Sequence, residues 1–430
     1  MVSTVSRDVD HARGDSTVAG PLPTTGPLQG VRVLDLSWIL SGPFCTMTLC
    51  DLGADVIKVE RPPWGDMGRT NRPLQDGESG YFLSVNRGKR SVSIDLKEER
   101  GRELFRDLVS EVDVLVENFS PGAMDDLGIG YEALAKINPR LIYAAISGFG
   151  RTGPWRNRPA LDVIAQGAGG IMSVTGHPGG PPTRPGSSLG DITAGLYAAV
   201  GILAALHERE HSDCGQLIDI SMMDAQMAIQ ENAFMRWEIL GREPEKLGTR
   251  HPTAVPFQAF PTSDGWVVLA LAWGGTDQWG LLCAALEHPE LIDDPRFATA
   301  EARTDHHAQL EPLLEEAFRK RTSQEWIDTL LPMRIPCGPL HTISEAAASE
   351  QTVARAMLSP VEHHTFGEVN LVNTPVKLSR TPGGIRGSSP DMGAHSFEVL
   401  AELLGMETAA VQMLVEAGVV HTERGVPELG

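Results

Sequence analysis

The chain has few cysteines and no long uncharged stretch. Its five cysteines are scattered over 430 residues and form no CxxC pair, so neither a disulfide framework nor a thiolate zinc site is expected. This cysteine usage is typical of a reducing compartment, and we expect a cytoplasmic protein. The longest uncharged helical run, residues 192–206, is shorter than a membrane span, so a core helix is expected there.

Positive charge is also scarce, with 36 Lys and Arg against 56 Asp and Glu, a net charge of −20. Binding to nucleic acid or to an acidic membrane requires a basic face, so we expect neither partner. Residues 1–26 lack the apolar core of a secretory signal. They also contain Asp8, Asp10 and Asp15, which a transit peptide would avoid, so we expect a disordered tail.

Alternating strand and helix patterns predict an α/β protein. Apolar runs typical of buried strands are followed by helical patterns, which indicates parallel strands in a large, open, Rossmann-like sheet. The expected strands are 31–36, 55–60, 91–96, 113–117 and 141–146, with helices over 44–52 and 98–111. Later patterns, with a strand at 266–271 and helices at 277–286 and within 298–331, predict a smaller α/β domain.

The predicted organisation therefore has two domains, with the small one inserted into the large one. Its parts are a disordered tail at 1–26, the first part of the large domain at 27–225, a linker at 226–255, the small domain at 256–350, and a return linker with the C-terminal part of the large domain at 351–430.

Residues 184–195 (RPGSSLGDITAG) place Asp191 at the start of an apolar, alanine-rich helix pattern. Aspartate is a favoured N-cap residue, because its oxygen accepts a hydrogen bond from an N–H of the first turn. Alternatively, a carboxylate kept ionised by the helix N-terminus could act as a covalent nucleophile, and Gly190 would leave room for a substrate carbonyl. The local pattern does not choose between these interpretations.

Three other segments contain motifs that are typical of binding or metal sites. Residues 148–153 (GFGRTG) fit GxGxxG, but Pro154 and Pro159 follow where a dinucleotide-binding helix would begin, so a tight loop beside a ligand is favoured. Residues 207–211 (HEREH) could support a zinc hydrolase through His207 and His211, or form a solvated last turn, and no third ligand follows. The basic residues of 86–90 (NRGKR) indicate either an exposed loop or a phosphate site.

Long motifs, in order, resemble the class III CoA-transferases, a family that includes formyl-CoA and succinyl-CoA-dependent transferases and 2-methylacyl-CoA racemase. The resemblance covers about 27–405 and is carried by 30–37 (GVRVLDLS), 41–43 (SGP), 51–62 (DLGADVIKVERP), 86–91 (NRGKRS), 116–122 (VENFSPG), 147–150 (SGFG), 152–154 (TGP) and 190–191 (GD). It implies the two-domain class III fold and an intertwined homodimer, although pairing with a paralogue stays open.

The resemblance also implies the chemistry. Asp191 would attack an acyl-CoA thioester and form an aspartyl anhydride and then an aspartyl-CoA thioester, which an acceptor carboxylic acid would resolve. The CoA thioester would be a substrate, with no tightly bound cofactor and no metal. The implied CoA contacts are Leu40, Ser41, Arg61, Ile94, Asp95, Leu96, Lys97, Asn118, Phe119, Ser120, Ser147, Gly148, Phe149 and Gly150.

Two further features bear on the substrate. Gly274 and Gly275 resemble the glycine loop that closes over the nucleophile, or form a plain turn. Arg184 could bind the distal carboxylate of a diacid, or be a solvated loop residue.

Departures from the family's motifs narrow the activity. The racemase carries a His before an Asp where this chain has Leu161 and Asp162, so racemisation is the alternative rather than the main hypothesis. Formyl-CoA transferases have Gln at Leu40, Lys at Ser147 and Arg at Asp126. The remaining resemblance is to succinyl-CoA-dependent dicarboxylate CoA-transferases, which is the predicted function.

Overall fold

The structure is a computed structural model that describes residues 26–271 and 277–422. It confirms the mixed α/β class. A seven-stranded sheet has the order β14-β5-β2-β1-β6-β7-β8, and every neighbouring pair is parallel except β14 with β5. The strands are β1 (Arg32–Asp35), β2 (Asp55–Glu60), β5 (Arg90–Ile94), β6 (Val114–Glu117), β7 (Ile142–Ser147), β8 (Leu217–Ser221) and β14 (Val420–His421).

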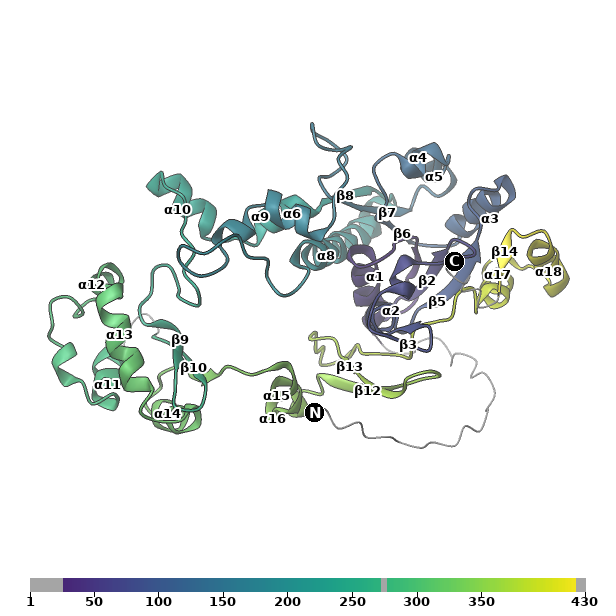
Figure 1. Ribbon diagram of the computed structural model, residues 1–430. Helices are drawn as coiled ribbons and strands as arrows, with labels where there is room; N and C mark the ends of the chain where they lie inside the picture. Colours follow the sequence, from purple (N-terminus) through teal and green to yellow (C-terminus); the bar gives the residue numbers. More distant parts are fainter. Residues whose placement is uncertain (1–25, 272–276, 423–430) are drawn as a thin grey trace.

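Helices cover both faces of this sheet, which explains why its strands are apolar runs rather than alternating patterns. One face packs against a layer built mainly from α3 (Glu99–Ser110), α5 (Tyr131–Ile137), α17 (Ser396–Leu404) and α18 (Thr408–Glu416). The other face packs against α1 (Ser41–Asp51), α8 (Leu189–Ser212) and α9 (Met222–Ala228). The C-terminal helices α17 and α18 therefore belong to the same lobe as the first strands (Figure 1).

The strand order places a topological switch point between β1 and β6. From β1 the chain proceeds to β2 and β5 on one side, and then to β6, β7 and β8 on the other. In open parallel sheets the loops at such a point diverge, which leaves a crevice for ligands outside the carboxyl ends of the strands. The fold alone therefore predicts a binding site at the loops that follow β1 and β6.

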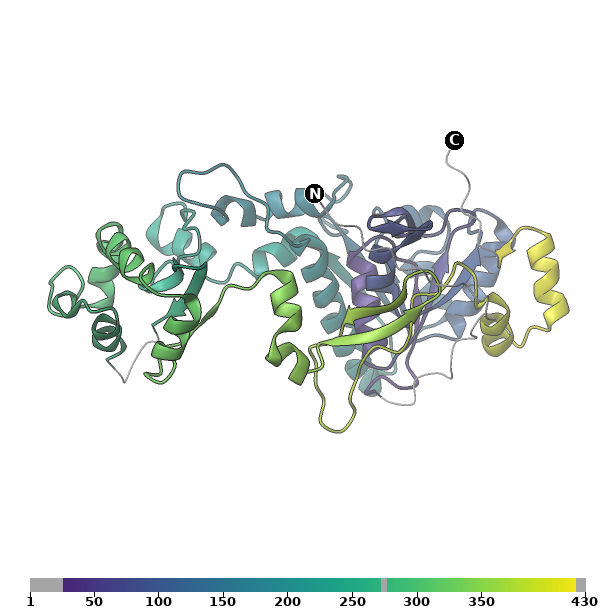
Figure 2. The ribbon, with the colours of Figure 1, turned by 60° about the horizontal axis from the view of Figure 1, so that its bottom comes forward.

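A second lobe has a three-stranded antiparallel sheet and a separate apolar core. Its elements are β9 (Phe257–Pro261), β10 (Trp266–Ala270), α11 (Gln278–Ala285), η2 (Pro289–Leu291), α12 (Ala300–Asp305), α13 (His307–Phe318), α14 (Ser323–Leu330) and β11 (Cys337–Pro339). The stretch expected to be helical over 298–331 is thus three helices. Figures 1 and 2 show this lobe at the opposite end of the molecule from α17 and α18.

Two connections join the lobes. The outgoing one contains α10 (Ala233–Leu240), and the returning one contains α15 (Ile343–Ala348) and α16 (Glu350–Ala354). The returning chain then forms a hairpin of β12 (Leu358–His363) and β13 (Gly367–Val372), which packs through Val361 and Leu371 on Leu83 of the large lobe. The remaining elements are η1 (Met67–Thr70), β3 (Leu74–Gln75), β4 (Glu78–Ser79), α2 (Gly80–Asn86), α4 (Ala123–Asp126), α6 (Asp162–Ala168) and α7 (Ile171–Val174).

Some predictions fall on residues that the structure does not describe. The predicted tail at 1–26 lies, except for Gly26, outside the described residues, and so do Gly274 and Gly275.

Helix α8 differs from its sequence-based expectation in length, because it extends to 24 residues. By length and composition alone it could cross a membrane, and it is the one such helix among the described residues. It packs closely on α1, since a Cβ at Gly195 would lie 2.5 Å from the carbonyl oxygen of Ser41.

Candidate active site

The loops on either side of the switch point are joined by one side chain. Asn118, which follows β6, accepts a hydrogen bond from the backbone N–H of Trp38 at 2.9 Å. Its amide nitrogen donates to the carbonyl oxygen of Trp38 at 2.9 Å and to the hydroxyl oxygen of Ser41 at 3.0 Å. Asn118 therefore fixes the loop after β1 and orients Ser41 at the start of α1.

Buried charged side chains also contact the loop after β1. Ile39 has a positive φ of 65°, which is unfavourable for a β-branched residue, and its N–H donates to Asp66 Oδ1 at 2.9 Å. Lys58 lies 2.9 Å from Asp66 and donates to the carbonyl oxygen of Ser37 at 2.7 Å. Because these partners are buried and paired, they can hold the strained backbone of the loop in one conformation.

Asp35 lies at the centre of these buried charges. Lys89 Nζ donates to Asp35 Oδ2 at 2.9 Å, and the hydroxyl of Thr46 donates to the same oxygen at 2.8 Å. Burial by itself would raise the pKa of Asp35, but Lys58 and Lys89 outweigh it and hold that pKa well below its usual range. Asp35 is thus an ionised, fully paired carboxylate with a structural role.

The basic cluster at 86–90 is neither an exposed loop nor a phosphate site. Lys89 pairs with Asp35, as described above. Arg87 pairs with Asp51 at 2.6 Å, and Arg90 pairs with Asp55 and with Glu402. All three basic side chains are buried. The sequence could not reveal this, because each acidic partner is more than thirty positions away.

The residues predicted to contact CoA follow the carboxyl ends of five neighbouring strands. Leu40 and Ser41 come after β1, Arg61 after β2, residues 94–97 at the end of β5, 118–120 after β6, and 147–150 at the end of β7. Since the strands are parallel, these segments share one edge of the sheet. Arg61 and Lys97 are exposed there. Their contacts with CoA stay a prediction.

Asp191 lies at the N-terminal end of α8, but it is not the N-cap, so that interpretation was wrong. The helix begins at Leu189 and its N-cap is Ser188, which places Asp191 third in the helix. The pKa of Asp191 is raised to about 7, first by burial and then by the nearby carboxylate of Asp162. A hydrogen bond from Ser41 and the charge of Arg184 partly oppose that shift.

Arg184, for which a role with substrate was one of two expectations, contacts Asp162 in the structure. Its Nη2 and Nε atoms lie 2.9 Å and 3.2 Å from Asp162 Oδ2, and Nη2 also donates to Ser188 at 2.9 Å. The side chain of Arg184 is still 38% exposed. Arg184 is therefore not simply a solvated loop residue.

Sequence reasoning missed two residues of this site. Tyr81, on α2, has its pKa raised to about 12 by burial and then by Asp191, Asp66 and Asp162, which places its ring among these carboxylates. No local pattern marks it. The sequence marks Asp162 only as the half of a racemase pair whose histidine is missing. It gives no signal of the contacts that Asp162 makes with the backbone of Gly190 and Asp191.

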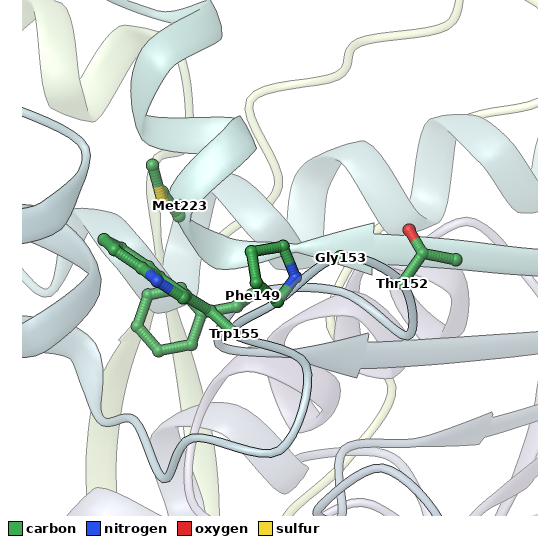
Figure 3. A pocket seen from close by; sticks show the side chains of 6 residues that line it. Phe149, Thr152, Gly153, Trp155 and Met223 are labelled. Atoms are coloured by element: carbon green, nitrogen blue, oxygen red, sulfur yellow. The ribbon is translucent and has the colours of Figure 1, made fainter.

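The loop after β7 and the start of α9 form a shallow apolar pocket, whose lining residues are Phe149, Thr152, Gly153, Pro154, Trp155 and Met223 (Figure 3). The rings of Phe149 and Trp155 meet edge to face, with centroids 5.3 Å apart. Gly148 is required by close packing, because a Cβ there would lie 2.2 Å from the Cβ of Ala160. The GxGxxG motif thus forms a tight loop without a following helix.

The HExxH motif forms a solvated turn. His207 and His211 meet edge to face at 5.1 Å near the end of α8, and the side chain of His207 is 78% exposed. Among the described residues, one other group could hold a metal, namely Glu78, His363 and His364. The Nδ1 atom of His363 already accepts backbone N–H groups at 3.1 Å and 3.4 Å, which leaves that lone pair unavailable to a metal.

Comparisons with known proteins agree with this geometry. A sequence model described as CoA-transferase family III matches residues 28–396. The chain is 44% identical to the acetyl-CoA:oxalate CoA-transferase of Acetobacter aceti, over 84% of this chain and 92% of that protein. It is 36% identical to the succinyl-CoA:glutarate CoA-transferase of Mus musculus, over 92% and 90%.

Among solved structures, a CAIB/BAIF family protein from Brucella suis superposes with a TM-score of 0.79 at 39% identity. The match covers 88% of this chain and all of that one. The extent of these matches, together with the switch-point site and the placement of Asp191, leads to one conclusion: the chain belongs to CoA-transferase family III and transfers CoA between carboxylic acids.

Proposed function

We propose that the protein moves CoA from succinyl-CoA, or another dicarboxylyl-CoA, to a carboxylic acid acceptor, with Asp191 as the covalent nucleophile. One observation carries the proposal: Asp191 is a partly buried carboxylate whose pKa of about 7 leaves a large ionised fraction at neutral pH. A carboxylate with a raised pKa is also a better nucleophile than an ordinary one, once it is ionised.

The proposed reaction balances without ATP. A carboxylate oxygen of Asp191 attacks the thioester carbonyl, the C–S bond breaks, and a mixed anhydride and the CoA thiolate form. The thiolate then attacks the aspartyl carbonyl, which releases the donor acid and leaves an aspartyl-CoA thioester. The acceptor carboxylate attacks this thioester, which breaks the C–S bond and gives a second mixed anhydride and the CoA thiolate. The thiolate finally attacks the acceptor's carbonyl carbon, which breaks the anhydride C–O bond, forms the acceptor's CoA thioester and regenerates the carboxylate of Asp191.

Within this reaction, the residues around Asp191 have separate tasks. Ser41 donates a hydrogen bond to the nucleophile and thereby favours its ionised form. The exposed Arg61 and Lys97 suit the phosphates of CoA at the carboxyl edge of the sheet. Arg184 has an exposed side from which it could fork onto the second carboxylate of a diacid.

The names of the relatives support a dicarboxylate substrate, since oxalate and glutarate are both diacids. They differ in the donor, which is acetyl-CoA in one name and succinyl-CoA in the other. The 2-methylacyl-CoA racemase alternative is not favoured by these names, and the chain has Leu161 where the racemase has a histidine. A zinc hydrolase at His207 and His211 lacks a third ligand among the described residues.

We further propose a cytoplasmic homodimer with intertwined chains. Apolar side chains are exposed along one face of α8, where Leu196 is 44% and Val200 61% exposed. The connecting helix α10 exposes more of them, including Trp237 and Ile239. A second copy of the chain would cover such faces. Size-exclusion chromatography with light scattering should give twice the chain mass of 46.4 kDa, whereas a monomer would contradict this part.

The function is tested by a panel of acyl-CoA donors and acceptor acids, read by mass spectrometry of the CoA products. Succinyl-CoA and acetyl-CoA should be offered with glutarate, oxalate, mesaconate, citramalate and malate. We expect exchange with at least one diacid and none after Asp191→Ala. Deuterium exchange at the α-carbon of an acyl-CoA without any acceptor would favour the racemase. Absence of exchange with every pair would contradict the proposal.

A further inference from the structure

The first turn of helix α8 donates hydrogen bonds to a side chain of another helix. Ser188, the N-cap of α8, makes no side-chain hydrogen bond to that turn. Instead Asp162, the first residue of α6, accepts from the N–H of Gly190 at 2.9 Å and from the N–H of Asp191 at 3.4 Å. The leading N–H groups of a helix have no partner within the helix, so an oxygen from outside satisfies them as an N-cap would.

The two oxygens of Asp162 are divided between two tasks. Oδ1 accepts the N–H groups of both Gly190 and Asp191. Oδ2 receives Arg184 through Nη2 and Nε, and also Nε2 of Gln166 at 2.8 Å. The side chain of Asp162 is only 12% exposed. Because both oxygens are held by donors, the carboxylate has one well-defined orientation under the start of α8.

Because residue 190 is a glycine, Asp162 can come close to the first turn of α8. A Cβ on Gly190 would lie 3.0 Å from Asp162 Oδ1 and 3.1 Å from the carbonyl oxygen of Asp162. The glycine therefore lets α6 approach the first turn of α8. This differs from the sequence-based interpretation, in which Gly190 makes room for the substrate.

We propose that Asp162 is a positioning residue that caps α8 from outside the helix and fixes the first turn, which carries Asp191. The carboxylate of Asp191 then does not have to accept a backbone N–H and stays available for reaction. The inference rests on the proposed function of Asp191. An aspartate at the N-cap would use an oxygen to accept a backbone N–H, whereas Asp191, third in the helix, directs its carboxylate to the hydroxyl of Ser41.

The charges around Asp191 give the proposal a signature in pH dependence. Four groups face it, namely Asp162, Arg184, Ser41 and Tyr81. Asp162 raises the pKa of Asp191, whereas Arg184 lowers it. Removal of the charge at 162 should therefore move the pH midpoint of acylation below about 7, and removal of the charge at 184 should move it above.

The experiment measures how fast hydroxylamine traps acylated Asp191 in the full-length protein mixed with succinyl-CoA. The rates are taken as a function of pH for wild type, Asp162→Ala, Asp162→Asn and Arg184→Gln. Above the midpoint, where Asp191 is ionised in every variant, Asp162→Ala should react at least roughly tenfold more slowly through misplacement of the nucleophile. Asp162→Asn keeps one acceptor oxygen, so its trapping rate should lie between those of wild type and Asp162→Ala. Its pH midpoint should fall, because the charge at 162 is removed.

Thr322→Ala provides the matched control. It removes the N-cap of α14, in the other lobe, where Thr322 accepts the N–H of Glu325. It should lower the melting temperature but leave the trapping rate and its pH midpoint unchanged. Gly190→Ala should also slow the trapping reaction, because its Cβ would displace the Asp162 carboxylate while the charge at 162 remains.

Two outcomes separate the possible failures. If wild type forms no adduct on Asp191, the proposed function fails. If wild type forms the adduct and Asp162→Ala reacts at the same rate with the same pH midpoint, the positioning role is overturned. If Asp162→Ala does not fold, the pH midpoint of trapping in Asp162→Asn decides. A midpoint equal to that of wild type would also overturn the positioning role.

Discussion

Asp35 and Asp191 are two sheltered carboxylates in the same lobe, and they differ in almost every other respect. Asp35 is fully buried, lies beside Lys58 and Lys89, and has a pKa held well below its usual range. Asp191 lies beside another carboxylate and has a pKa raised to about 7. Burial alone would raise both pKa values, so the neighbouring charges decide the difference.

The two carboxylates therefore have different roles. The pairing of Asp35 stabilises the loop that presents Ser41, and its oxygens are occupied by donors. Because the pKa of Asp191 is raised, ionisation of this carboxyl destabilises the folded protein. The ionised form is the one that the proposed reaction needs for attack.

The largest expected effect comes from breaking the pairing around Asp35. Lys89→Met should leave Asp35 buried with one cation fewer and lower the free energy of unfolding by about 3–5 kcal/mol. Urea denaturation measures the change. The exposed Lys320→Met serves as control and should stay within about 0.5 kcal/mol of wild type. Equal stability of the two variants would show that Asp35 does not depend on Lys89.

The next effect has the opposite sign. Asp191→Asn removes a carboxylate whose pKa is raised from 3.8 to about 7, so the variant should be more stable than wild type by up to about 4 kcal/mol. The folded protein binds the proton more tightly than the unfolded chain does. The contribution of the Asp191 carboxyl to the free energy of unfolding of wild type is therefore fully present below pH 4. It is lost as the pH rises through 7.

Thermal denaturation of wild type and Asp191→Asn across that pH range tests this point. The difference in melting temperature should be small in acid and should grow toward neutral pH. A constant difference across the range would indicate that the pKa of Asp191 is not raised.

The sheet and the helix that carries Asp191 could be predicted from the sequence, because both depend on short segments. The segments 55–60 and 113–117 are rich in Val, Ile and Leu, and the structure places β2 and β6 there within one residue. The helix at Asp191 was also expected, but it begins two residues earlier, at Leu189. Its first turn donates to Asp162, which lies 28 positions before Gly190. Tertiary contacts of this kind leave no local signal.

A smaller effect should follow from loosening the loop that the paired charges support. Asn118→Ala removes the hydrogen bonds that join Trp38 and Ser41 across the switch point, which should cost about 1–3 kcal/mol of stability. We also expect a several-fold rise in KM for the CoA thioester, because the β1 loop borders the predicted CoA site. Steady-state kinetics measure it, and an unchanged KM would place CoA away from this loop.

The smallest effect is expected at the HExxH motif. His211→Ala changes an exposed side chain at the end of α8, so CoA transfer, stability and zinc content should all match wild type. Elemental analysis of the purified protein checks the last of these. Loss of bound zinc together with activity would revive the zinc hydrolase alternative.

The central claim is that Asp191 becomes acylated, and peptide mass spectrometry tests it most directly. Wild type incubated with succinyl-CoA and hydroxylamine should carry a hydroxamate on the peptide that contains Asp191, and on no other acidic residue. Asp191→Asn should carry none and should not transfer CoA. Undiminished turnover in Asp191→Asn, or a hydroxamate at another carboxylate, would contradict the account.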